Sequence, residues 1–121
     1  MSTPPHYSPC IEAGDLIFTS GQLPIISRDP LEVPQGIKEQ AELVLRKVED
    51  LLKQYGLSRR HIIKTTAYIE HIEDWYAVNE VYASFFGDLK PARSIIPVSE
   101  LHFGCLIELE AIASKAHPIA E

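Results

Sequence analysis

The apolar residues from Ile37 to Tyr55 recur every three or four positions, which is the spacing of one face of an α-helix. The charged residues between Glu39 and Lys53 fall off this stripe, so we expect a solvated face there and not a binding site. Gly56 is placed to end the helix, because glycine readily adopts the left-handed conformation of a helix C-terminus. The pattern predicts a helix from residue 37 to about residue 55.

A second helical stripe follows and is largely aromatic. Asp74 is suited to cap its N-terminus and Gly87 to end it. Helical spacing explains this stripe without any ligand, so we expect it to lie in the core, with Asn79 beside it. The stripe consists of Trp75, Val78, Tyr82 and Phe85.

The remaining regular segments are short and rich in β-branched or aromatic side chains, as strands require. We predict strands at residues 7–11, 16–20, 62–69, 93–98 and 105–113. The turn signal Glu12-Ala13-Gly14-Asp15 makes the first two a hairpin, and the turn formers between Ser27 and Gly36 predict a surface loop.

The element order is therefore strand, strand, helix, strand, helix, strand, strand. The economical arrangement is an α+β domain in which two helices pack on one face of a mixed sheet. With 121 residues the chain fits a single domain, residues 1–121. The other face of the sheet carries Leu, Ile and Ala, so it needs cover, and we expect another subunit to supply it.

Composition narrows the class of protein. Hydrophobic residues make up 45% and charged residues 23%, and no apolar run approaches the roughly 18 residues that span a bilayer. The N-terminus through His6 lacks the features of a signal peptide, so we expect a cytoplasmic protein without a membrane segment. The net charge of −6 disfavours nucleic acid as a partner, despite the short basic run Arg59-Arg60-His61.

Metal and redox chemistry are not indicated by the cysteines and histidines. Cys10 and Cys105 are far apart without a CxxC motif, and the five histidines include no i,i+4 pair and no HExxH motif. We expect packed thiols, and neither a metal nor a cofactor.

The strongest candidate chemistry is the segment Pro91-Ala92-Arg93-Ser94 together with Glu108 in the last strand. Arginine can hold a planar carboxylate through parallel N–H···O bonds, while a glutamate can orient or deprotonate a water beside it. This pair suits hydrolysis of a small acid. A surface arginine at a strand start and a glutamate on a solvated strand face would explain the same residues.

Four linked motifs stand in order along the chain. They are Ala13-Gly14-Asp15-Leu16-Ile17-Phe18-Thr19-Ser20-Gly21-Gln22, Val78-Asn79-Glu80-Val81-Tyr82 with Phe85-Phe86, Pro91-Ala92-Arg93-Ser94, and Ile107-Glu108-Leu109-Glu110-Ala111-Ile112-Ala113. In these motifs the chain resembles the RidA/YjgF family of reactive-intermediate (enamine/imine) deaminases, also known as L-PSP endoribonucleases or translation inhibitors.

The resemblance implies a chorismate-mutase-like α+β fold and a homotrimer whose sheets face a central barrel, with ligand sites between neighbouring subunits. It implies that Arg93 binds the substrate carboxylate and Glu108 holds the attacking water. The positions that match the lining of the family's cleft are Tyr7, Ser20, Gly21 and Asn79.

The chain departs from the family pattern at three places. Pro5-His6-Tyr7 stands where Gly-Pro-Tyr is usual, and Leu101-His102-Phe103-Gly104 replaces the usual Leu-Pro turn. Ile95 occupies the position of a frequent cysteine, where its backbone N–H can still donate to a carboxylate. These departures bear on substrate range more than on reaction type.

The expected activity is hydrolysis of 2-enamino and 2-imino acids, such as 2-aminoacrylate, to 2-keto acids and ammonia. This is the activity of a 2-iminobutanoate/2-iminopropanoate deaminase, and it needs no metal, cofactor or covalent nucleophile. The alternative is a non-catalytic trimeric module that binds small carboxylates or 2-keto acids as a sensor or chaperone. A ribonuclease would need RNA contacts that the acidic charge balance does not supply.

Overall fold

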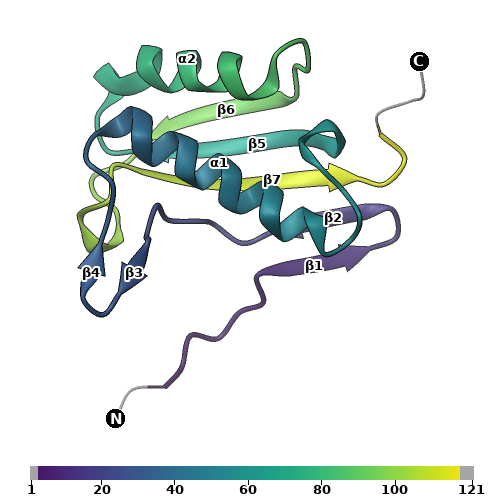
Figure 1. Cartoon of the computed structure of the whole chain (residues 1–121), viewed down its shortest axis with the longest axis horizontal. Coiled ribbons are helices and arrows are strands. Elements are labelled where there is room, and N and C mark those ends of the chain that lie inside the picture. The colour runs from purple at the N-terminus through teal and green to yellow at the C-terminus, as the bar shows by residue number, and fades with distance from the viewer. Residues whose placement is uncertain (1–2, 118–121) are drawn as a thin grey trace.

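The computed structural model describes residues 3–117, and its main sheet has five strands in the order β1-β2-β7-β5-β6. Neighbouring strands are antiparallel except β5 and β6, which are parallel. The strands are β1 (Cys10–Ala13), β2 (Leu16–Thr19), β5 (Ile62–Ile69), β6 (Ala92–Pro97) and β7 (Ile107–Ser114). The mixed sheet that the element order predicts is confirmed (Figure 1).

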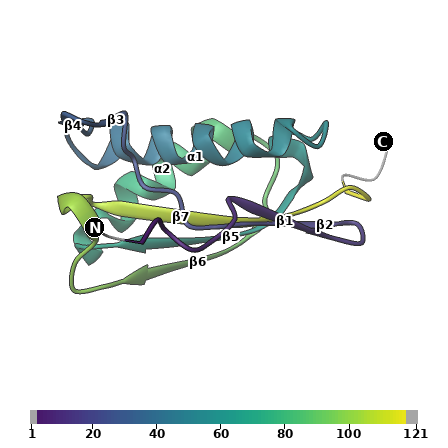
Figure 2. The same cartoon turned by 90° about the horizontal axis from the view of Figure 1, so that it is seen from below.

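Both long helices lie on the same face of the sheet, as Figure 2 shows from the side. They are α1 (Ile37–Lys53) and α2 (Trp75–Phe86), and they contact each other as well as the strands. The predicted α+β arrangement is therefore confirmed. Gly56 has φ 74° just beyond α1, in the left-handed conformation expected of it. Neither helix is long and apolar enough to cross a membrane, within the described residues.

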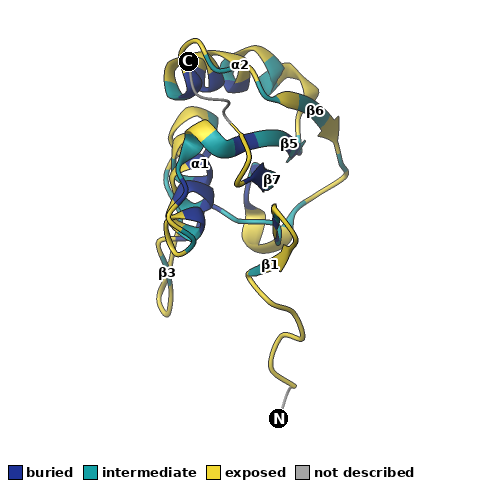
Figure 3. Ribbon diagram, turned by 90° about the vertical axis from the view of Figure 1, so that its right-hand side faces the viewer, coloured by how far each residue is buried: buried dark blue, intermediate teal, exposed yellow. Residues whose placement is uncertain are grey.

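The core fills the space between the helices and the sheet. Alternate residues of β7, including Ile107, Leu109 and Ala111, are buried beneath α1, whose buried side faces the strands in Figure 3. The buried hydroxyl of Thr65 is also satisfied there, because Tyr82 Oη donates to Thr65 Oγ1 at 2.8 Å.

Most of the aromatic stripe of α2 lies in or against the core, as expected. Val78 and Tyr82 are buried, and Phe85 is partly buried and packs against the core. Trp75 is only partly buried and is not part of the core cluster, so its assignment to the core was wrong. The outer side of Phe85 also meets a cation, since the guanidinium carbon of Arg59 lies 3.8 Å from its ring centroid.

The charged side of α1 is also not wholly solvated, which corrects the expectation from the stripe. Glu49 is 9% exposed and accepts bonds from Arg59 Nη2 at 2.8 Å and from Arg59 Nε at 3.0 Å. Arg59 Nη1 also donates to the carbonyl oxygen of Phe85 at 2.7 Å. This network joins α1 to the end of α2, and the hydrogen bonds from Arg59 lower the pKa of Glu49.

The first hairpin is tighter than predicted. Ala13 pairs with Leu16, so only Gly14 and Asp15 form the turn, and Gly14 has the φ of 60° that such a turn requires. The first strand begins at Cys10 and not at Tyr7.

Three other segments differ locally from the prediction. The predicted loop contains a small hairpin of β3 (Ser27–Arg28) and β4 (Leu31–Glu32). The last strand begins at Ile107 because residues His102–Gly104 form a 3₁₀ turn. Asp74 stands at the N-cap of α2 without a capping side-chain bond, because it closes the short 3₁₀ turn Ile72–Asp74.

The second face of the sheet carries no layer from the described part of the chain (Figure 2). The paired residues Ile11 and Phe18 are 55% and 39% exposed on it, and Ile96 is 40% exposed. Glu108 and Glu110 of β7 share this face, because alternate residues of a strand point to the same side. An apolar surface of this kind is what the predicted subunit contact would cover.

Candidate functional site

Arg93 lies on the edge strand β6, and its side chain reaches under α2. Its Nη1 donates to Asn79 Oδ1 at 2.9 Å. The guanidinium carbon also lies 4.9 Å from the ring centroid of Tyr82 and 5.2 Å from that of Trp75. No carboxylate among residues 3–117 forms an ion pair with this guanidinium, so its remaining N–H groups are available to an anion.

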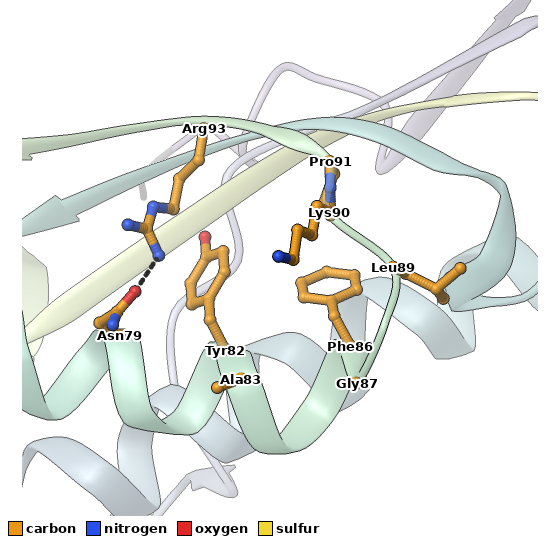
Figure 4. A pocket seen from close by; sticks show the side chains of 9 residues that line it. All are labelled: Asn79, Tyr82, Ala83, Phe86, Gly87, Leu89, Lys90, Pro91 and Arg93. Atoms are coloured by element: carbon orange, nitrogen blue, oxygen red, sulfur yellow. Dashed lines mark hydrogen bonds between the residues drawn. The ribbon is translucent and has the colours of Figure 1, made fainter.

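A pocket of about 510 Å³ opens beside Arg93, between α2 and the loop that leads into β6. Figure 4 shows Arg93 pointing from β6 toward Asn79 on α2, with the ring of Tyr82 between them and Phe86. Burial raises the pKa of Tyr82 to about 12, so its hydroxyl stays neutral and donates to Thr65. The lining residues are Asn79, Tyr82, Ala83, Phe86, Gly87, Leu89, Lys90, Pro91 and Arg93.

Glu108 lies on β7 with its carboxylate against Gly21, the second residue after β2. A Cβ atom on Gly21 would collide with Glu108 Oε2 and lie 2.9 Å from Cδ, so only glycine leaves room for this carboxylate. Burial, and secondarily the charge of Glu110, raise the pKa of Glu108 above its ordinary value. A raised pKa makes this carboxylate a better proton acceptor.

One chain by itself does not bring Arg93 and Glu108 together. Arg93 is in register with Thr65 of β5, whereas Glu108 is in register with Tyr68. Residues 65 and 68 of one strand point to opposite faces, so Arg93 lies on the helix side of the sheet and Glu108 on the open side. We call Arg93 with the pocket beside it the Arg93 half-site, and Glu108 with Gly21 the Glu108 half-site.

The other predicted site residues divide between these half-sites. Asn79 is hydrogen-bonded to Arg93, and the side chain of Ile95 packs against the core from β6. Ser20 Oγ donates to the carbonyl oxygen of Ser8 at 2.6 Å, which ties down the N-terminal segment that carries Tyr7. Tyr7 and Gly21 line a second pocket, of about 230 Å³.

Residues that sequence reasoning missed also contribute. Trp75 and Tyr82 place their rings near the Arg93 guanidinium, although their helical spacing indicated only a place in the core. Lys47 belongs to the charged side of α1 that was expected to be solvated, but its Nζ donates to Leu23 O at 2.8 Å and Ile25 O at 3.1 Å. That loop lies far away in sequence, so no local pattern could have indicated the contact.

The cysteines and the acidic groups form no metal-binding set within residues 3–117. Cys10 and Cys105 are free thiols, and Cys105 is fully buried, as expected of a packed thiol. Burial raises the pKa of both thiols, which makes them poor nucleophiles at neutral pH.

Comparison with known proteins reveals likeness over most of the chain. The sequence model of the family described as Endoribonuclease L-PSP matches residues 1–115. A RutC family protein of Pyrococcus horikoshii is 42% identical over 109 residues, which are 90% of this chain and 86% of that protein. Reactive Intermediate Deaminase A, a chloroplastic protein of Arabidopsis thaliana, is 36% identical over 108 residues, which are 89% of this chain and 58% of the plant protein.

The fold is shared as well. The crystal structure of E. coli TdcF with bound serine superposes with a TM-score of 0.83 at 35% identity, over 93% of this chain and 90% of that chain. Likeness in sequence and in structure thus covers both half-sites.

Proposed function

Because the chain belongs to the Endoribonuclease L-PSP family, which includes the reactive intermediate deaminases, we propose that it hydrolyses 2-enamino and 2-imino acids to 2-keto acids and ammonia. We further propose that it does so as a homotrimer, in which Arg93 of one copy and Glu108 of a neighbouring copy share one cleft. The substrates are small reactive acids such as 2-aminoacrylate after tautomerisation to the imine.

The observation that carries this proposal is Arg93. It is a partly buried cation beside a pocket, it has no ion pair among the described residues, and it is oriented by Asn79 and two aromatic rings. A guanidinium held in this way can bind a carboxylate through two parallel bonds, which fixes the atom next to that carboxylate.

Glu108 supplies the complementary chemistry. A water held by its carboxylate attacks C2 of the imine, Glu108 accepts one proton of that water, and the imine nitrogen gains one proton, which gives a carbinolamine. Its hydroxyl group then loses its proton while the nitrogen takes up another, so that the C–N bond breaks, ammonia leaves and the oxygen remains as the ketone of the 2-keto acid. Positioning contributes most of the rate, because imines already hydrolyse in water.

The separation of the half-sites supports this assembly. Arg93 lies at the edge strand β6 and Glu108 lies on the open sheet face, which carries exposed apolar residues that a neighbouring copy can cover. A cleft between copies would place the two groups on either side of one substrate.

A second candidate is a non-catalytic module that binds small carboxylic acids. It is supported by the bound serine in E. coli TdcF, which is a small carboxylic acid held by a relative. Ribonuclease activity is not proposed, because 17 acidic against 11 basic residues give a charge that repels RNA.

The test is ammonia release from imino acids formed in situ by an amino-acid oxidase. Arg93→Lys is expected to abolish most turnover, because lysine keeps the charge but loses the planar two-point grip. Arg46→Lys is the matched control, since Arg46 is exposed on α1 and lines neither the Arg93 pocket nor the pocket that Gly21 borders. Near-normal turnover in Arg93→Lys would mean that Arg93 is structural. An inactive wild type that still binds 2-keto acids would favour the non-catalytic module.

A further inference from the structure

Two cations outside the proposed chemistry face one pocket. Arg28 of β3 and Lys47 of α1 both line the cavity of about 230 Å³ that Tyr7 and Gly21 border. Neither forms an ion pair with a carboxylate of the described residues. In a chain with 17 acidic and 11 basic residues, two neighbouring cations without an acidic partner indicate a place for an external anion.

Both cations are held in place by the fold. Lys47 Nζ donates to the carbonyl oxygens of Leu23 and Ile25, which fixes the ammonium at the pocket and leaves it a further N–H to donate. The guanidinium carbon of Arg28 lies 5.2 Å from the ring centroid of Phe103, so the ring supports the planar group while its N–H edges stay open. Burial, and then the charge of Arg28, lower the pKa of Lys47, as expected for two cations brought close together.

This pocket adjoins the Glu108 half-site. Gly21 lines the pocket and also lies against the Glu108 carboxylate. The buried thiol of Cys105 lies near both groups, because the charge of Lys47 lowers its pKa and the charge of Glu108 raises it. A molecule whose C2 lies beside Glu108 could therefore extend its side chain past Gly21 toward Arg28 and Lys47.

We propose that Arg28 and Lys47 bind a second acidic group at the far end of the substrate, so that the preferred substrates are 2-imino dicarboxylic acids. This inference rests on the proposed function. The carboxylate next to C2 would remain on Arg93, and the distal carboxylate would accept charge-assisted hydrogen bonds from the cation pair. A neutral side chain would place apolar atoms beside both cations and give neither an anionic partner, which disfavours it.

The kinetic test compares imines formed in situ by oxidases from glutamate and from norvaline, which has an uncharged side chain. Wild type is expected to prefer the glutamate-derived imine in kcat/KM by about tenfold or more. Arg28→Gln and Lys47→Gln should each lower kcat/KM for the glutamate-derived imine about tenfold more than for the norvaline-derived imine. Most of this difference should come from a higher KM. Glutamine at 47 can still donate to the loop carbonyls, so the pocket wall is retained.

Arg46→Gln removes the same charge from the exposed position next to Lys47, and it should leave the preference intact. A wild type without preference, or a preference that survives both pocket substitutions, would overturn the inference.

Calorimetry separates this inference from the proposed function. Wild type should bind 2-oxoglutarate more tightly than 2-oxopentanoate, and Arg28→Gln should reduce that difference. If no imine is hydrolysed but this binding difference holds, the catalytic proposal fails while the anion pocket stands. Equal binding of the two keto acids would overturn the pocket, whatever the turnover.

Discussion

Substituting Gly21 by alanine should separate folding from catalysis, because the added methyl group competes with the Glu108 carboxylate for the same space. The new Cβ would collide with Oε2 and lie 2.9 Å from Cδ and 3.2 Å from Cγ of Glu108. Gly21 is not among the glycines with positive φ, so alanine can adopt its backbone conformation. The only group that must yield is the flexible end of Glu108.

The size of the effect follows from this geometry. Relieving the overlap requires the carboxylate to move by on the order of 1 Å, and a displacement of that size at a catalytic group can cost about 10²-fold in rate. Holding Glu108 off its preferred rotamer costs only about 0.5–1.5 kcal/mol, which the fold should tolerate. Activity should therefore fall by about 10²-fold while the protein still folds and assembles.

Thermal unfolding and ammonia release, measured on the same samples, check both parts. A double-mutant cycle isolates the cause: in a Glu108→Ala background there is no carboxylate to displace, so Gly21→Ala should cost little further activity. Full turnover in Gly21→Ala, or an equal loss in both backgrounds, would refute the idea that Gly21 acts by making room for Glu108.

Three other substitutions probe the site and the fold. Glu108→Gln should retain 2-keto acid binding while turnover falls by roughly 10²-fold, because an amide cannot accept the proton; a much smaller loss would mean that Glu108 only positions water. Burial and the Glu110 charge raise the pKa of Glu108, so Glu110→Gln should lower that pKa and move the acid limb of the kcat/KM profile to lower pH; an unmoved limb would contradict this coupling. Arg59→Met, with Arg60→Met as control, should destabilise the fold by about 2 kcal/mol or more in urea unfolding, since it leaves Glu49 unpaired. The greater free energy of unfolding of the wild type should be fully present above the ordinary glutamate pKa of about 4.3 and should disappear as pH falls through the lowered pKa of Glu49. Equal stability of wild type and Arg59→Met at neutral pH would show that the ion pair does not stabilise the fold.

The sequence could predict most of the fold because its strongest signals are local. The stripe from Ile37 onward marks α1, and the β-branched run at Ile62–Ile69 marks β5, since each pattern matches the burial of its own element. Strand ends were less predictable. Whether Tyr7 or Cys10 begins β1, and whether Ser27 pairs with Glu32, depends on backbone partners that local composition does not specify.

The sequence could suggest candidate site residues but not how they lie relative to one another. Arg93 and Glu108 could be identified as candidates, but their placement on opposite faces depends on the register of both strands with β5. The contact of Lys47 with a distant loop could not be predicted, for a related reason. The helical stripe shows which side of α1 faces the core, but not that the carbonyl oxygens of Leu23 and Ile25 lie over its charged side.

If each site combines Arg93 of one copy with Glu108 of another, two inactive variants should restore activity to each other in mixed trimers. Arg93→Lys and Glu108→Gln chains, each nearly inactive alone, are unfolded together in equal amounts and allowed to reassemble. In a cyclic trimer every mixed assembly regains a single intact site, and about three quarters of the assemblies are mixed, so activity should recover to about one quarter of that of wild type. If the mixture stays as inactive as the separate variants while sedimentation shows mixed trimers, Arg93 and Glu108 of neighbouring copies do not share a site.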